Sequence, residues 1–148
     1  MIILFLSILF FFSNAEYSWS IDRINQQYII PDFKIFDTNF GQNVTVYVID
    51  SGFTNNSLFY DNIILTKSFI DNNYPNDTDG HGTHVISLIS SKYGVSDNVN
   101  IVSLKLFNST HDGDDSHLIK ALNFSSEHCS NHYNKCIINL SIGFENIN

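Results

Sequence analysis

Two segments of this sequence carry residues that could act together in catalysis. The first ends a run of β-branched residues with Asp50, and the second places His81 in Asp-Gly-His-Gly-Thr-His thirty-one positions later. A carboxylate can accept a hydrogen bond from imidazole Nδ1, fix the tautomer of the ring and stabilise the imidazolium ion, which leaves Nε2 to take a proton from a serine. The sequence therefore predicts the acid and the general base of a catalytic triad, with Asp50 and His81 as the catalytic residues.

The elements that would position these two residues alternate between strands and helices. Apolar β-branched runs predict strands and amphipathic segments predict helices, with strands at 44–49, 62–67, 100–107 and 136–142 and helices at 82–92 and 115–129. Such alternation implies right-handed crossovers and a mainly parallel sheet. The predicted fold class is therefore α/β, with helices flanking the sheet.

The helical periodicity also predicts which side chains face the sheet. The expected inward residues are apolar and share one face of each helix: Val85, Leu88 and Ile89 on the first, and Leu118, Ile119 and Leu122 on the second. Because the carboxyl ends of parallel strands gather at one edge, Asp50 and His81 would meet above the sheet.

Six segments resemble a known family in the same order along the chain. Besides Asp50-Ser51-Gly52 and His81-Gly82-Thr83-His84-Val85, they are residues 19–24, 93–95, 101–107 and 138–143. Together they resemble the subtilisin-like serine proteases, especially their proteinase K-like branch. The resemblance implies a three-layer subtilisin-like fold, with residues 16–148 as the amino-terminal part of the peptidase domain, and peptide-bond hydrolysis by an Asp-His-Ser triad.

The nucleophile of that triad is not found in this sequence. No serine after His81 lies in anything like the family's Gly-Thr-Ser-Met-Ala, and the family's oxyanion-hole asparagine should likewise lie beyond Asn148. Since one oxyanion donor alone contributes about a hundredfold to a thousandfold, we expect the 148 residues as written not to hydrolyse peptides. Two functions remain open: a fragment or truncated form of a secreted serine endopeptidase, or a catalytically inactive homologue that binds peptides or a protease as a regulator.

The first fifteen residues predict a secretory signal peptide, with a buried helix or strand as the alternative. An apolar run of about a dozen residues, shorter than a membrane span, precedes the cleavage site predicted after Ser13-Asn14-Ala15. The mature chain, residues 16–148, would then be one small secreted domain. Its formal net charge of -8 and its lack of a basic cluster argue against nucleic acid and anionic membrane surfaces as partners.

A secretory route would permit two covalent modifications. Cys129 and Cys136 are the only cysteines and could form a disulfide, although one buried and one exposed thiol is the alternative. Asn-X-Ser/Thr sequons predict N-glycosylation at Asn43, Asn55, Asn76, Asn108 and Asn123. A sixth sequon, at Asn139, lies in a strand that we expect to be buried.

The sequence identifies neither a metal site nor a cofactor. The run Asp112-Gly113-Asp114-Asp115 lacks the ligand spacing of an EF-hand, so calcium binding is left open without an identified site. The run is expected to form a turn before a helix capped by Asp115 or Ser116.

Two segments resemble the edges that hold substrate in the family. Leu140-Ser141-Ile142-Gly143 resembles the edge that binds a peptide backbone, so Leu140, Ser141 and Gly143 are the expected substrate-binding residues. By the same resemblance the acidic run at 112–115 lies beside the opposite edge, where it would favour basic residues. The expected partner is a peptide or protein substrate in extended form, and a further partner could cover apolar faces that this part of the domain leaves exposed.

Overall fold

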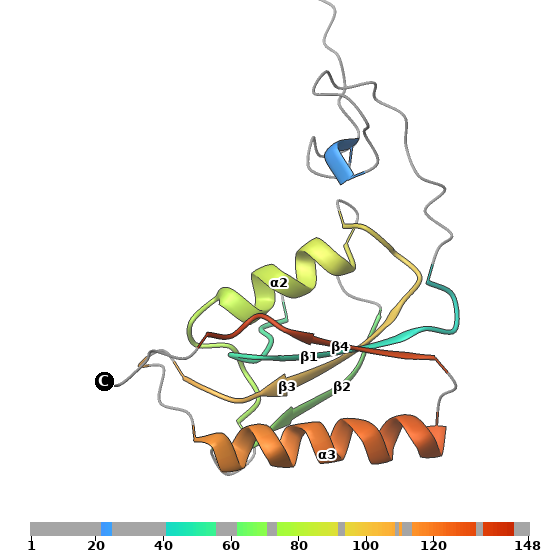
Figure 1. The fold of residues 1–148 in the computed structure, drawn as a ribbon. Helices are drawn as coiled ribbons and strands as arrows, with labels where there is room; N and C mark the ends of the chain where they lie inside the picture. Colours follow the sequence, from blue (N-terminus) through green and yellow to red (C-terminus); the bar gives the residue numbers. More distant parts are fainter. Residues whose placement is uncertain are drawn as a thin grey trace, which may run out of the picture.

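The computed structural model describes residues 22–24, 41–55, 62–70, 74–91, 94–108, 110, 114–132 and 135–143. Within these residues a parallel sheet lies between two helices, with α2 on one face and α3 on the other (Figure 1). This arrangement confirms the predicted α/β class of three layers. The predicted signal peptide and the segment at 19–21 lie outside the described residues.

The described elements follow one another in the predicted order. The strands pair in the order β2-β3-β1-β4, and each pairing is parallel. The bounds are β1 (Thr45–Asp50), β2 (Ile63–Ser68), α2 (His81–Ile89), β3 (Asn100–Lys105), α3 (Asp115–His132) and β4 (Cys136–Leu140).

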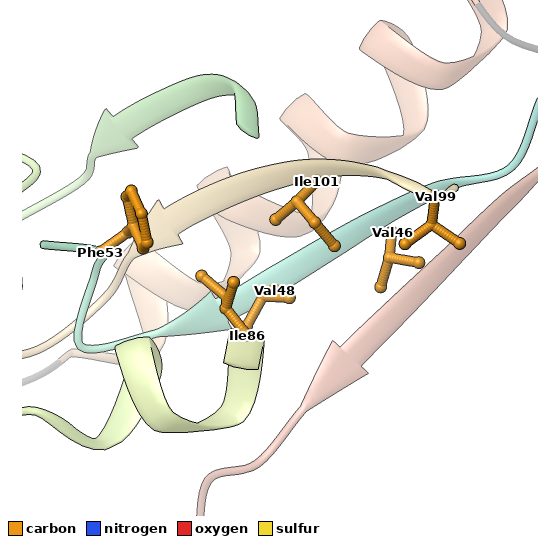
Figure 2. Packing of buried hydrophobic residues seen from close by; sticks show 6 residues of the cluster. All are labelled: Val46, Val48, Phe53, Ile86, Val99 and Ile101. Carbon is orange, nitrogen blue, oxygen red and sulfur yellow. The ribbon is translucent and has the colours of Figure 1, made fainter. Parts of the chain in front are cut away.

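The central strand, β1, carries both halves of the core. All six of its residues are buried, and alternate side chains point to opposite faces of the sheet. Val46 and Val48 pack on the α2 side with Ile86 and Ile101 (Figure 2), whereas Tyr47 and the neighbouring apolar residues pack on the α3 side. Because β1 has a strand on each side and a helix over each face, its last residue, Asp50, is held in a rigid position.

The inner faces of both helices differ in part from the prediction. Leu88 and Ile119 were expected to face the sheet, but they are 46% and 58% exposed. In α2 the buried residues are Gly82 and Ile86, and in α3 they are Ala121 and Ser125. In each helix the two buried residues are four positions apart and lie on one face, so the residues two positions away turn toward the solvent.

The last strand, β4, was expected to be buried, and that prediction was wrong: three of its five residues are exposed and the other two are half-buried. Within the described residues β4 pairs with β1 and ends the sheet. Ile137, Ile138 and Leu140 are 55%, 41% and 46% exposed, because this edge has no further described strand beside it. Apolar surface therefore lies open along β4.

Candidate active site

Asp50 and His81 meet at the carboxyl end of the central strand. His81 is the first residue of α2, and its Nδ1 lies 2.8 Å from Oδ1 and 3.0 Å from Oδ2 of Asp50. The Asp50 side chain is 1% exposed and that of His81 is 46% exposed. With Nδ1–H donating to the buried carboxylate, Nε2 is left to act on a neighbouring group.

The electrostatics of His81 follow from this contact. The hydrogen bond to Asp50 raises the pKa of His81 above its ordinary value of 6.5. Partial burial acts in the opposite direction, and the charges of Asp50, Asp79 and Asp77 add to the increase. The site therefore stabilises the imidazolium ion, as a general base that must carry a proton during a reaction requires.

Two glycines allow α2 to approach the end of β1. A Cβ atom on Gly82 would lie 2.4 Å from the carbonyl oxygen of Gly52 and 3.1 Å from Oδ1 of Asp50. Gly52 itself has φ 108°, and a Cβ there would lie 2.4 Å from the carbonyl oxygen of Pro75. The glycines that follow the acid and the base are thus required by close backbone packing around the pair.

Asp77 was not singled out by sequence reasoning, yet it organises the start of α2. One carboxylate oxygen accepts hydrogen bonds from the Ser51 hydroxyl group and from the amides of Asp79 and Gly80, at 2.8, 3.0 and 2.8 Å. The other oxygen accepts from the amide and the hydroxyl group of Thr83, at 2.8 and 2.6 Å. Gly80, the residue that precedes the helix, has no side chain that could cap it. Asp77, three residues upstream, supplies the cap instead.

The pKa of Asp77 reflects this environment. Burial raises it, but the hydrogen bonds from Thr83, Gly80 and Ser51 outweigh burial and hold the pKa below the ordinary value of 3.8. One feature of the sequence could have pointed to Asp77. Gly80, the residue before the helix, has no side chain to cap it, so another acceptor must bind the first backbone amides of α2.

A cleft of about 280 Å³ opens beside His81. It is lined by His81 and by residues from three other parts of the chain: Asp79, Leu106, Phe107, Asp114, Asp115, Leu118, Ser141, Ile142 and Gly143. The structure thus brings the expected substrate-binding residues Ser141 and Gly143 to the same cleft as His81. Leu140, the last residue of β4, is not among the lining residues.

Asp114 and Asp115, the two described residues of the acidic run, line this cleft, although the capping residue differs from the prediction. Oδ1 of Asp114 accepts a hydrogen bond from the Ser116 amide at 2.8 Å, so the cap is Asp114 rather than Asp115 or Ser116. That hydrogen bond lowers the pKa of Asp114. Of the described residues, no group of three His, Cys, Asp or Glu side chains is arranged to hold a metal ion.

The residues predicted to be modified are not among those that line the cleft. Cys129 and Cys136 form a disulfide in the structure, with a Cα–Cα distance of 6.3 Å, which joins the end of α3 to the start of β4. The sequon residues that are exposed are Asn43, Asn55, Asn76 and Asn123, and Asn108 is half-buried. No described helix is long and apolar enough to cross a bilayer.

A parallel α/β sheet whose central strand ends in an aspartate bonded to histidine Nδ1 has the acid–base arrangement of a serine protease. Residues 41–148 match the subtilase family, and the chain belongs to that family of serine proteases.

Relatives and a solved structure agree with this assignment. The chain is 33% identical over 129 residues to subtilisin-like protease 5 of Arthroderma benhamiae, covering 84% of this chain and 32% of the relative. It is 37% identical over 113 residues to a subtilase-type proteinase of Saccharomyces cerevisiae, covering 70% and 22%. The crystal structure of a cold-adapted subtilisin-like serine proteinase matches with a TM-score of 0.70 and 30% identity, over 86% of this chain and 46% of that one. The chain thus spans about a third of the length of the first of these relatives.

Proposed function

We propose that this chain supplies the acid and the base of a secreted serine endopeptidase. Asp50 orients His81, and His81 accepts the proton of a serine that lies outside these 148 residues. The observation that carries the proposal is the hydrogen bond of 2.8 Å between His81 Nδ1 and the buried Asp50 carboxylate. It selects the tautomer in which Nε2 is the basic atom, and it stabilises the ring once that atom is protonated.

The proposed substrate is a peptide in extended conformation. Ser141 and Gly143 line the cleft beside His81, opposite residues such as Leu106 and Phe107. A peptide lying between the two segments would present its scissile carbonyl group near His81. The carboxylates of Asp79, Asp114 and Asp115 at the cleft would favour substrates with a basic residue on this side.

The test uses the complete protein as expressed from its gene. Peptide hydrolysis and labelling by a serine-directed fluorophosphonate are measured for the unaltered protein, His81→Ala, Asp50→Asn and the control His84→Ala. Removing the acid of a triad lowers kcat by roughly ten-thousandfold, and removing the base lowers it by about a millionfold. His84, on the same helix, is exposed and its replacement should leave kcat within about twofold of the unaltered value.

A complete protein that neither hydrolyses peptides nor reacts with the fluorophosphonate would contradict the enzyme proposal. The second candidate, a regulatory protein that binds peptides or a protease, would then gain support if a fluorescent peptide still bound. The cleft and the exposed apolar side chains of β4 favour this candidate, because both could hold a partner without a nucleophile.

A further inference from the structure

Lys105, the last residue of β3, is buried where the proposed chemistry gives it no role. Its relative exposure is 1%, and it lies opposite Asp50 in the register between β3 and β1. Since paired residues of neighbouring parallel strands share a face of the sheet, Lys105 is on the same face as Asp50, the face that α2 covers. Burying an ammonium group costs free energy unless hydrogen bonds replace those it made with water. The partners of the Lys105 ammonium group therefore matter.

The ammonium group of Lys105 is bonded to the loop that precedes α2. Nζ donates to the carbonyl oxygen of Asn76 at 2.7 Å and lies 6.0 Å from the ring centroid of Tyr74. Within the described part of the chain these are the contacts of the group, and neither is with a carboxylate. The ammonium group of Lys105 therefore binds the Asn76 peptide group of this loop.

The Asn76 carbonyl is the middle one of three successive loop carbonyls that accept hydrogen bonds from residues in or just after the strands. The Phe53 amide donates to the Pro75 carbonyl at 3.2 Å, and the Thr54 hydroxyl group donates to the Asp77 carbonyl at 2.8 Å. Both of these donors follow β1, whereas Lys105 supplies the middle contact from β3. The loop is thereby fixed to two strands rather than to one.

The residue after Asn76 transmits this constraint to the start of α2. The carboxylate of Asp77 holds the amides of Gly80 and Thr83 on either side of His81. It also accepts from the Ser51 hydroxyl group, which itself accepts from the Gly82 amide at 2.9 Å. Displacement of the Asn76 peptide would therefore move the groups that set the position of His81 relative to Asp50.

We propose that Lys105 is a positioning residue for the Asp50–His81 pair, acting through the loop of residues 74–80 that its ammonium group holds. It does not contact the reacting atoms. It fixes the loop, Asp77 fixes the first turn of α2, and the hydrogen bond between His81 Nδ1 and Asp50 follows from that placement.

The pKa of His81 distinguishes positioning from simple electrostatics, because the two predict opposite signs. Loss of a nearby positive charge alone would raise the pKa of His81. Loss of positioning weakens the hydrogen bond to Asp50, which is the largest cause of the raised pKa, and would lower it. Asp79 and Asp77, the other carboxylates that raise the pKa of His81 besides Asp50, are not replaced in the test variant.

The experiment is an NMR titration of imidazole nitrogen shifts in the complete protein, with His81 assigned from a His81→Gln sample. Lys105→Met should lower the pKa of His81 toward its ordinary value. It should also speed hydrogen exchange of the Thr83 amide by about tenfold, the factor expected when a charge-assisted hydrogen bond holding the loop is lost. The control is Lys67→Met, which removes the same charge from β2 at a lysine that contacts the rings of Phe69 and Phe124; it should leave the pKa of His81 unchanged.

An unchanged or raised pKa of His81 in Lys105→Met would overturn the proposal. If that variant does not fold, Lys105→Gln replaces it, because its shorter neutral side chain keeps a polar end in the site, and the same two outcomes apply. The titration needs no peptide hydrolysis, so its failure is distinguishable from failure of the proposed protease activity.

Discussion

Ser51 donates a hydrogen bond from its hydroxyl group to the carboxylate of Asp77 over 2.8 Å. The same hydroxyl oxygen accepts from the Gly82 amide. The residue after the proposed catalytic acid therefore touches both the loop before α2 and the residue after the proposed base.

Asp77→Asn should destabilise the start of α2. The amide cannot accept at both ends, so a donor such as the Thr83 amide or hydroxyl group loses its acceptor. We expect the free energy of unfolding to fall by about 2 kcal/mol, the range for a hydrogen bond to a charged group. Chemical denaturation measures it, and Asp97→Asn is the control because Asp97 is exposed. Equal losses in both variants would count against a special role of Asp77.

Acid should weaken the same contact. Because the folded-state pKa of Asp77 lies below 3.8, its contribution to stability is present above pH 3.8 and is lost as the pH falls through the lowered value. The difference in unfolding free energy between the unaltered protein and Asp77→Asn should therefore be constant near neutral pH and shrink in acid. A difference that did not depend on pH would show that ionisation of Asp77 is irrelevant.

If the complete protein hydrolyses peptides, kcat/KM should rise with pH through a pKa above 6.5. A general base must be neutral to accept a proton, and the hydrogen bond to Asp50 raises the pKa of His81. Weakening that bond with Asp50→Asn should move the rising limb of the residual activity to lower pH. A limb that stayed in place would assign it to another group.

Gly82→Ala should damage both stability and the Asp50–His81 pair. The added methyl group would lie 2.4 Å from the Gly52 carbonyl oxygen, and relief of such a clash costs about 1–3 kcal/mol. At Gly143 a Cβ atom would meet nothing within 4 Å, so Gly143→Ala is the matched control. Thermal unfolding and the low-field Nδ1 proton signal of His81 report the two effects; equal melting temperatures would contradict the close approach.

Removing the disulfide should lower stability without altering the Asp50–His81 pair. Cys129 and Cys136 are separated by seven positions, and closing a loop of this length contributes about 2–3 kcal/mol by chain entropy. Urea unfolding of the protein and of a Cys129→Ser, Cys136→Ser double variant measures the difference. Thiol titration under denaturing conditions is the control, and two reactive thiols before reduction would show that the bridge is absent.

Mild acid should also destabilise the α3 side of the sheet. Nδ1 of His128 lies 2.9 Å from the hydroxyl group of buried Tyr47, and burial, followed by the charges of His132 and Lys67, lowers the pKa of His128 below 6.5. The unfolded state therefore binds more protons between the lowered value and 6.5, so stability falls as the pH drops through that window.

His128→Gln tests this effect, because glutamine can still accept from Tyr47 but does not titrate. The variant should lose less stability than the unaltered protein between pH 7.5 and about 5. Protonation of His81 acts in the opposite sense but is common to both proteins, so it cancels in the comparison. Parallel pH profiles would remove His128 as the cause.

The sequence predicted the elements well because their signals are local. β1 ends in Asp50 and α2 begins at His81 as the β-branched run and the glycine-flanked histidine indicated. The inner faces of the helices were harder to predict. Ile119 is exposed while Ala121 is buried, because the face of α3 that packs on the sheet is selected by how closely helix and sheet can approach and not by apolarity alone. Asp77 and Lys105 were missed because their roles depend on a loop meeting the ends of two strands, which no local pattern records.

The order of the strands in the sheet has a consequence for folding. The strand that carries Asp50 is the first described strand along the chain, yet its neighbours pair Thr45 with Asn100 and with Cys136. Such distant pairings require the chain to lose the entropy of long loops before the stabilising contacts form, and this makes folding slow. The sheet around Asp50 is therefore complete only after the chain has been synthesised as far as β4. Until then the apolar side chains of β1 are exposed to chaperones and to other nascent chains.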